Sequence, residues 1–425
     1  MKKYQLLMAG AAALAMMTSH TFAKETVTFW QFSTIEGDIA AWNDAIKAFE
    51  AANPDIDINM EIVPWASQQQ RLVSALTTGG LPDVSMLGNN VVAQFQAAGA
   101  LVLLDPYMEA YDKANGTDVA SQVWPGDKGY YFLQGKWWGA PVNVETRALF
   151  YRKDLFQAAG LDPDKPPQTW EELAKDAKIL TEKAPKGTYG VGLNMGISYD
   201  TIHNFMSVWL GYGARMLDDK GKCAFRSPEF EDALTVFTGM FKDGSTHPDA
   251  ATMADDTVRR GFLDGNYAMI LQAPVLVRDI KTENPPWAKD VGIALVPAGP
   301  AGRAGFLGGW PLVLWNASEH KEAAAKWIMF ATHDGLKQLA TAGGFIPGNI
   351  QLAQEAPWDQ APYPLFVKQL YDAKPYQYPS EAIPEMGQLE VNAVQTAVQA
   401  VALGKQTANE AAADLCTTID EVLAR

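Results

Sequence analysis

The sequence predicts an α/β protein whose chain alternates short strands with amphipathic helices. Three observations support this prediction: apolar residues that alternate as in a strand, apolar residues at helical spacing directly after them, and turn residues between the two. The chain has 425 residues, which at roughly 100 to 200 residues per domain suggests two or three domains. Its 48% apolar and 20% charged residues are typical of a globular protein and exclude a disordered or coiled-coil chain.

The first 23 residues have the pattern of a cleavable secretory signal. Lys2 and Lys3 form a basic start, an uncharged run follows from 6 to 17, and residues 21–23 (TFA) fit a cleavage site. A membrane anchor would need about 20 apolar residues, and this run is too short. We therefore predict export, removal of residues 1–23 and a mature protein in the periplasm.

The mature chain opens with a strand followed by a helix. Apolar residues alternate at Val27 and Phe29, then recur at helical spacing from Ile39 to Phe49 until Asn53-Pro54 ends the helix. Later segments continue the alternation, with a strand at 56–62, a helix around 72–76 and a strand at 83–87. Alternating strands and helices predict a sheet covered on both faces, with ligands at the carboxyl ends of its strands.

The same alternation resumes after Trp137. Thr169 and Glu172 have the spacing of a capping box, and Ser227-Pro228 supplies an N-cap and a first-turn proline. Ser318 is expected to cap a helix that carries Trp327. The other predicted elements are strands at 148–151, 267–271, 291–296 and 312–315, helices at 386–403 and 407–422, and one long irregular segment at 357–384.

The chain lacks the motifs of common catalytic and metal sites. Its mature part holds four histidines, and none has a partner at the one-turn spacing of zinc ligands. Residues 196–200 (GISYD) miss the GxSxG pattern at the last position. Paired acids such as Asp255-Asp256 fit solvated turns better than the two carboxylates of a glycosidase. We therefore predict no catalytic residue, no metal and no cofactor.

Composition also restricts the partners. The chain has 34 Lys+Arg against 49 Asp+Glu, a formal net charge of -15, which argues against nucleic acid and anionic membrane surfaces. Its two cysteines, Cys223 and Cys416, are far apart in the sequence. An oxidising compartment would permit a disulfide between them, but two unlinked buried thiols stay equally open.

Several short motifs occur in a characteristic order along the chain. From the N-terminus they are NP at 53–54, GLPDV at 80–84, GAL at 99–101, GAP at 139–141, LFYRKDLF at 149–156, QTWEEL at 168–173, FLDGNYAM at 262–269, GG at 308–309 and AAKW at 324–327. In this order they resemble the family 1 extracellular solute-binding proteins of ABC importers, the group that includes maltose-binding protein. The resemblance spans nearly the whole mature chain.

The resemblance implies a type II periplasmic binding protein, with two discontinuous α/β lobes, a multi-segment hinge and a ligand in the cleft between the lobes. By analogy, lobe one comprises 24–143 plus 309–336, and lobe two comprises 144–308 plus 337–425. The resemblance further implies a carbohydrate ligand, an inner-membrane ABC permease as partner, a monomer and no bond chemistry.

A sugar cleft needs planar side chains that donate and accept hydrogen bonds, together with aromatic plates. The resemblance places such groups in loops that follow the strands of both lobes. In lobe one and the hinge, the candidates are Gln31, Thr34, Trp65, Gln68, Asn89, Asn90, Glu145, Gly308, Gly309 and Trp310, with Trp310 as the principal plate. In lobe two, they are Asp200, Asn204 and Gln272.

The identity of the ligand stays open at this point. Leu87-Gly88 and residues 387–390 stand where maltose-binding protein has tryptophans, so we expect a smaller sugar, a sugar alcohol or a differently shaped disaccharide. A glycerol-phosphate-like anion stays open through Arg147 or Arg303. The rival functions are a secreted carbohydrate-active enzyme, either lyase or glycosidase, and a binding module without transport.

Overall fold

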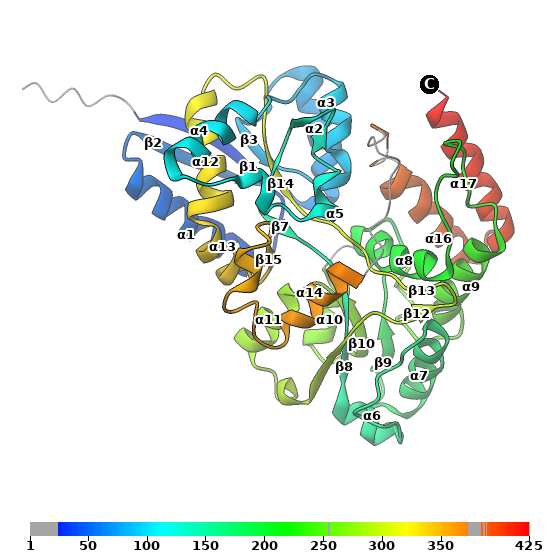
Figure 1. Cartoon of the computed structure of the whole chain (residues 1–425). Coiled ribbons are helices and arrows are strands. Elements are labelled where there is room, and N and C mark those ends of the chain that lie inside the picture. Colours follow the sequence, from blue (N-terminus) through cyan, green and yellow to red (C-terminus); the bar gives the residue numbers. More distant parts are fainter. Residues whose placement is uncertain (1–23, 254–255, 373–383, 386, 388, 425) are drawn as a thin grey trace, which may run out of the picture.

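The computed structural model describes residues 24–253, 256–372, 384–385, 387 and 389–424, so the predicted signal peptide lies outside the described residues. Figure 1 shows two α/β lobes, one on each side of a set of crossing segments. The predicted two-lobed α/β fold is therefore confirmed. Among the described residues, no helix combines the length and apolar character that a membrane span requires.

The first lobe is built on a five-stranded sheet of order β2-β1-β3-β14-β6. The strand β1 pairs in parallel with β2 and β3, whereas β14 runs antiparallel to both β3 and β6. The strands are β1 (Glu25–Gln31), β2 (Ile56–Ile62), β3 (Val84–Met86), β6 (Ala140–Pro141) and β14 (Pro311–Leu314). A short hairpin of β4 (Phe132–Leu133) and β5 (Lys136–Trp137) lies outside this sheet.

Aromatic side chains pack the helices of the first lobe against its sheet. The ring of Phe29 in β1 lies 5.0 Å from that of Trp42 and 5.7 Å from that of Trp327, as the helical spacing of these residues predicts. The helices are α1 (Glu36–Ala52), α2 (Gln68–Thr78), α3 (Val92–Ala97), α4 (Asp105–Asn115), α5 (Pro125–Lys128), α12 (Lys321–Met329) and α13 (Leu336–Gly343).

The second lobe is built on a four-stranded sheet of order β11-β8-β10-β9. The strand β8 (Ala148–Arg152) runs antiparallel to β10 (Tyr267–Gln272) and β11 (Val291–Ala294), and β9 (Tyr189–Gly192) is parallel to β10. Leu149 and Tyr151 face one core, and Phe150 faces the other. Because β8 is buried on both faces, its residues read as a continuous apolar run.

The helices of the second lobe surround this sheet (Figure 1). Strands β12 (Ala298–Gly299) and β13 (Gly302–Arg303) form a separate hairpin beside α8. The helices are α6 (Lys153–Ala159), α7 (Trp170–Lys183), α8 (Tyr199–Tyr212), α9 (Pro228–Lys242), α10 (Thr257–Leu263), α11 (Val275–Glu283), α14 (Tyr363–Asp372), α16 (Gln395–Ala402) and α17 (Ala408–Leu423).

The hinge consists of crossing segments that hydrogen-bond to one another. The strand β7 (Asn143–Val144) pairs with β15 (Ile346–Pro347). Next to it, the backbone N–H of Glu145 donates to Gly308 O at 2.7 Å, and the N–H of Gly308 donates to Glu145 O at 2.9 Å. The hinge segments around Glu145 and Gly308 therefore lie side by side.

The position of α13 changes the predicted division of the chain into two lobes. The analogy assigned 337–425 to lobe two, yet α13 packs against α1 of the first lobe. Its buried residues include Leu339 and Ala340, which belong to the same core as Phe49. In the division that we propose, α13 therefore belongs to lobe one, and the other boundaries stay as predicted.

Several local predictions can be compared with the structure directly. Thr169 accepts from the N–H of Glu172 at 3.1 Å, and Ser227 caps α9, so both predicted caps are confirmed. The predicted cap at Ser318 is wrong, because α12 begins at Lys321 with His320 as its N-cap. The Ser318 hydroxyl accepts from the N–H of His320 at 3.0 Å and donates to the buried carboxylate of Asp83 at 2.5 Å. The segment 357–384 is not irregular throughout, because α14 forms within it and packs on the second sheet.

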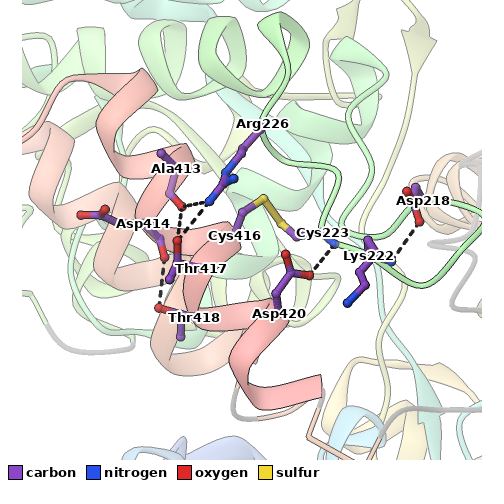
Figure 2. Close-up of a disulfide and its surroundings, with 10 residues drawn as sticks. All are labelled: Asp218, Lys222, Cys223, Arg226, Ala413, Asp414, Cys416, Thr417, Thr418 and Asp420. Carbon is purple, nitrogen blue, oxygen red and sulfur yellow. Dashed lines mark hydrogen bonds between the residues drawn. A yellow bond between two sulfur atoms is a disulfide. The ribbon is translucent and has the colours of Figure 1, made fainter. Parts of the chain in front are cut away.

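A disulfide joins Cys223 to Cys416, with the two Cα atoms 5.2 Å apart. Figure 2 shows the bond connecting the segment before α9 to the middle of α17. Beside it, Arg226 donates to Ala413 O at 3.1 Å and to Thr417 Oγ1 at 3.0 Å. The disulfide, which the sequence left open, therefore fastens the C-terminal helix to the second lobe.

The double substitution Cys223→Ser and Cys416→Ser should lower the free energy of unfolding by about 2–5 kcal/mol, because the cross-link restricts the unfolded chain. Thermal unfolding of the variant and of the wild type, each with and without reductant, measures this effect. Reduced wild type should match the variant. An equal Tm for all four samples would contradict a stabilising role of the disulfide.

Candidate ligand-binding cleft

A cleft opens between the two lobes beside the hinge, with about 1140 Å³ of empty space that includes open solvent. Its walls come from the loop after β1, from the hinge, and from the starts of α8, α10 and α11. A ligand pocket typically encloses about 300–1,000 Å³. The cleft therefore has room for a ligand the size of a mono- or disaccharide.

Most of the predicted binding residues line this cleft. They are Trp65, Asn89, Asn90, Glu145, Asp200, Gln272, Gly309 and Trp310. These residues come from both lobes and from the hinge, so segments that are far apart in the sequence meet there.

Other predicted residues lie outside the cleft lining as the described residues define it. The amide of Gln31 holds a tight turn, since it donates to Ser33 O at 2.6 Å and accepts from the N–H of Ser33 at 2.8 Å. Thr34 is exposed to solvent. Gly308 is occupied by its pairing with Glu145. Ser33, rather than Gln31 or Thr34, reaches the cleft from this loop.

Gln68 and Asn204 are buried without lining the cleft. The Oε1 atom of Gln68 lies 4.0 Å from the position that a Cβ on Gly88 would occupy, and Gly88 itself lines the cleft. Neither amide atom of Gln68, nor Oδ1 of Asn204, has a hydrogen-bond partner among the described residues. Both side chains therefore lie one layer behind the positions that we predicted for them.

The sequence prediction missed several polar residues of the lining. They are Asp38, Tyr130, Tyr199, Asp256, Arg259 and Glu390. His203, one turn after Asp200 in the same helix, and Arg147, which the sequence offered only as a contact for an anion, also line the cleft. Arg303, the alternative arginine, does not line the cleft and donates to Val296 O.

Arg147 lies at the centre of the polar wall of the cleft. Its Nη2 atom is 3.1 Å from Glu145 Oε1, 3.1 Å from Asp200 Oδ1 and 2.7 Å from His203 Nδ1. Its Nη1 atom donates to Gln272 Oε1. These five residues form what we call the Arg147 cluster, and one guanidinium, only 4% exposed, joins side chains from the hinge, α8 and β10.

The imidazole of His203 is a neutral member of this cluster. Because arginine has no acceptor, His203 Nδ1 must accept from Arg147, which leaves the proton on Nε2. Burial lowers the pKa of His203 well below its usual value, and the charge of Arg147 lowers it further. The ring stacks on Phe306, with centroids 3.9 Å apart.

Burial also affects the acid of the cluster that comes from the hinge. It raises the pKa of Glu145, while the charge of Arg147 opposes this rise. Removing one partner from a buried ion pair leaves an uncompensated charge and costs about 3–5 kcal/mol. The members of the Arg147 cluster therefore depend on one another.

A second arginine links the two lobes at another edge of the cleft. Arg278 of α11 donates to the carboxylate of Asp38 at the start of α1, and to Gly343 O at 2.7 Å. A Cβ at Gly37 would lie 2.7 Å from the guanidinium carbon, and one at Gly344 would lie 2.7 Å from the arginine Cβ. Glycine at these two positions therefore leaves the space that Arg278 needs.

Arg259 belongs to the cleft lining and is also paired. Its Nε atom is 3.2 Å from Asp256 Oδ1, and its Nη1 atom is 2.6 Å from Asp279 Oδ2. Asp279 also accepts from Arg278 at 2.7 Å. Carboxylates and guanidiniums thus alternate from lobe one through α11 to the start of α10.

Another part of the cleft lining is aromatic. The ring of Trp310 lies 6.2 Å from that of Trp65 and 5.4 Å from that of Phe345. Trp65 also lies 6.0 Å from Tyr199, which belongs to α8 of the second lobe. The backbone N–H of Trp310 donates to Asn143 Oδ1 at 2.7 Å, which fixes the tryptophan to the hinge.

Buried carboxyls support the amides of the lining. Asn89 donates to Asp127 Oδ1 at 3.0 Å, and Asn90 donates to Glu390 Oε2 at 2.9 Å. Burial raises the pKa of Asp127 to about 7, although Tyr131 and Asn89 both donate to it. Burial likewise raises the pKa of Glu390 to about 8. These two acids therefore orient amides that face the cleft.

The substitution Asp127→Asn should flatten the pH dependence of stability. A carboxyl with a raised pKa holds a proton in the folded protein that the unfolded chain loses near about pH 4. The stability contributed by Asp127 is thus present below about pH 4 and is lost as the pH rises through about 7. Urea unfolding between about pH 4 and about pH 8 should show a smaller loss of stability in the variant than in the wild type.

The matched control is Asp219→Asn, since Asp219 is exposed. This control should keep the wild-type pH profile. Parallel profiles for Asp127→Asn and the wild type would contradict the raised pKa.

The comparisons with known proteins identify the family. A family model of bacterial extracellular solute-binding proteins matches residues 33–338, and the chain belongs to this family. A binding protein of Brucella abortus (strain 2308) is 31% identical over 351 residues, which are 82% of each chain. The sn-glycerol-3-phosphate-binding periplasmic protein of Salmonella typhimurium (strain LT2) is 32% identical over 210 residues, 48% of this chain and 45% of that protein.

A solved structure shows the same fold with a ligand bound. It is an ABC transporter solute-binding protein of Thermotoga lettingae in complex with α-D-tagatose. Its TM-score to this chain is 0.84 at 27% identity, and the match covers 94% of this chain and 100% of that one. The family that the ordered motifs indicated is therefore confirmed.

Proposed function

We propose that the protein is a periplasmic receptor that binds a sugar or a related polyol in the cleft and delivers it to an inner-membrane ABC permease. The observation that carries this proposal is that one cleft is lined by both an aromatic wall and a hydrogen-bonding wall. Trp65 and Trp310 supply the first wall, and the Arg147 cluster supplies the second.

The two walls match the chemistry of a sugar. A sugar ring has weakly apolar faces, which pack on tryptophan, and a rim of hydroxyls that donate and accept. The amides of Asn89, Asn90 and Gln272 line the cleft and both donate and accept. The tagatose complex of the Thermotoga lettingae relative supports the same class of ligand.

The two lobes offer a way to enclose the ligand. Lining residues come from α1 on one side and from α8 on the other, and Arg278 already connects the lobes through Asp38. We propose that binding stabilises this closed arrangement, because a ligand shifts a conformational equilibrium toward the state that it binds better. The closed monomer is then the form that the permease recognises.

The rival function is a secreted lyase or glycosidase. A glycosidase needs one carboxyl as acid and a second one as base or nucleophile. Glu145 and Asp200 face the cleft as a pair, but both contact the same guanidinium of Arg147. Burial raises the pKa of Glu145, but the charge of Arg147 opposes this rise and stabilises the carboxylate form, so we propose binding without bond chemistry.

A panel of uncharged sugars and polyols should contain at least one compound that raises the Tm saturably and is recovered unchanged. A ligand at about 100 times its Kd stabilises the native state by about 2.7 kcal/mol, and we expect a Kd near about 1 μM. Differential scanning fluorimetry with chromatography of the supernatant measures both outcomes. Turnover of the compound would contradict the receptor function, and so would the absence of any binding.

The substitution Trp310→Ala should weaken that ligand by about tenfold, since an aromatic contact contributes about 0.5–1.5 kcal/mol beyond its buried area. The control is Trp287→Ala, because Trp287 is also partly buried but packs on Phe262 outside the cleft. Titration calorimetry should give the control variant the wild-type affinity. Full affinity in Trp310→Ala would remove Trp310 from the site.

A further inference from the structure

We propose that the cleft selects an uncharged ligand and rejects phosphates and carboxylates, because each arginine among its described lining residues is already shared by two carboxylates. This inference rests on the proposed function and narrows its ligand class. A free guanidinium in such a cleft would bind a phosphate or carboxylate strongly, often through two parallel hydrogen bonds. Whether an anion can bind therefore depends on whether these guanidiniums are already paired with carboxylates.

The positive charge of Arg147 is already balanced by two carboxylates. Its Nη2 atom lies 3.1 Å from a carboxylate oxygen of Glu145 and 3.1 Å from one of Asp200. Two carboxylates and one guanidinium carry a net negative charge, so a phosphate placed beside them would meet repulsion rather than attraction. Salt and solvent screen this repulsion only in part, because the side chains of Arg147, Glu145 and Asp200 are 5%, 12% and 11% exposed.

Arg259 repeats the arrangement at the start of α10. It contacts Asp256 at 3.2 Å and Asp279 at 2.6 Å. Asp279 is also bound by Arg278, which in turn holds Asp38. These three carboxylates and two guanidiniums again leave a net negative charge.

The remaining groups that could attract an anion are also neutral or occupied. The imidazole of His203 accepts from Arg147 and is uncharged. Asp38 and Asp200 stand in the first turns of α1 and α8, where they meet the positive ends of these helices. In α11, the N–H groups of Leu276 and Val277 donate to carbonyls three residues before them.

The same groups keep hydrogen-bonding capacity for a hydroxyl. Among the described residues, Nη1 of Arg147 bonds only Gln272, so its second N–H can donate to a hydroxyl. The proton on His203 Nε2 is a further donor, and the carboxylate of Glu145, which lines the cleft, is an acceptor. A neutral polyhydroxyl compound can use these donors and acceptors without bringing a charge into the cleft.

Matched pairs of ligands test this proposal on the wild-type protein. The pairs are mannitol with mannitol 1-phosphate, tagatose with tagatose 6-phosphate, and maltose with maltose 1-phosphate, with glycerol 3-phosphate as an additional anion. For any pair that binds, titration calorimetry should show the phosphate bound at least about tenfold more weakly than its neutral partner.

Each other outcome has a definite meaning. A phosphate that binds as tightly as its neutral partner, or tightly bound glycerol 3-phosphate, would overturn the inference and leave the receptor function intact. Binding of neither member of any pair, together with no binding in the whole panel of sugars and polyols, would overturn the proposed function and this inference with it.

A double variant tests the assignment to the Arg147 cluster. Glu145→Gln with Asp200→Asn leaves the guanidinium without its carboxylates, so the affinity ratio of phosphate to neutral ligand should rise about tenfold or more. Each single variant should show a smaller rise, and both also serve if the double variant does not fold. An unchanged ratio in folded variants would overturn the role of the cluster.

The control changes the overall charge by the same amount away from the cleft. Asp44→Asn with Glu182→Gln removes one aspartate and one glutamate from exposed positions on α1 and α7. This control should keep the wild-type ratio. An equal rise in the control would show that net charge, not the Arg147 cluster, sets the selectivity, and it would overturn the proposal.

Discussion

The cleft depends on the burial of one guanidinium between the hinge and the second lobe. A buried guanidinium costs several kcal/mol unless it is paired, and the partners of Arg147 come from three separate parts of the chain. Glu145 lies in the hinge directly after β7, Asp200 and His203 lie in the first turns of α8, and Gln272 is the last residue of β10. The pairing of the Arg147 charge therefore fixes the relative positions of the hinge, α8 and β10, which form the polar wall.

The rest of the site follows from where the hinge lies. The same crossing segment pairs Glu145 with Gly308, and two residues later Trp310 is held by Asn143. Glu145 of the polar wall and Trp310 of the aromatic wall thus lie on neighbouring segments of the hinge. Their positions relative to each other therefore do not depend on either lobe alone. Arg278 and Asp38 add a contact that exists only while the lobes are close. This arrangement fits a receptor that closes on its ligand.

The sequence was informative wherever a local pattern determined the outcome. Alternation and helical spacing predicted β1, α1 and β2, and the ordered motifs predicted the family. Prediction failed where an element boundary differed from the local pattern, as when α12 began at Lys321 with His320 as its N-cap and left Ser318 in the turn before it. Asp256 was assigned to a solvated turn and Arg259 gave no local signal, because only the folded α10 and α11 bring the two residues to the cleft as an ion pair.

A crystal structure of the protein with the neutral compound that raises its Tm most would show how the cleft holds its ligand. We expect the ligand to lie between the two lobes, with one face against Trp310 and hydroxyls within hydrogen-bonding distance of the Arg147 cluster. The Glu145–Arg147–Asp200 contacts should persist in the complex. A ligand held by one lobe alone, or a complex in which Arg147 leaves its carboxylates to bind the ligand, would contradict both the proposed closure and the proposed selectivity.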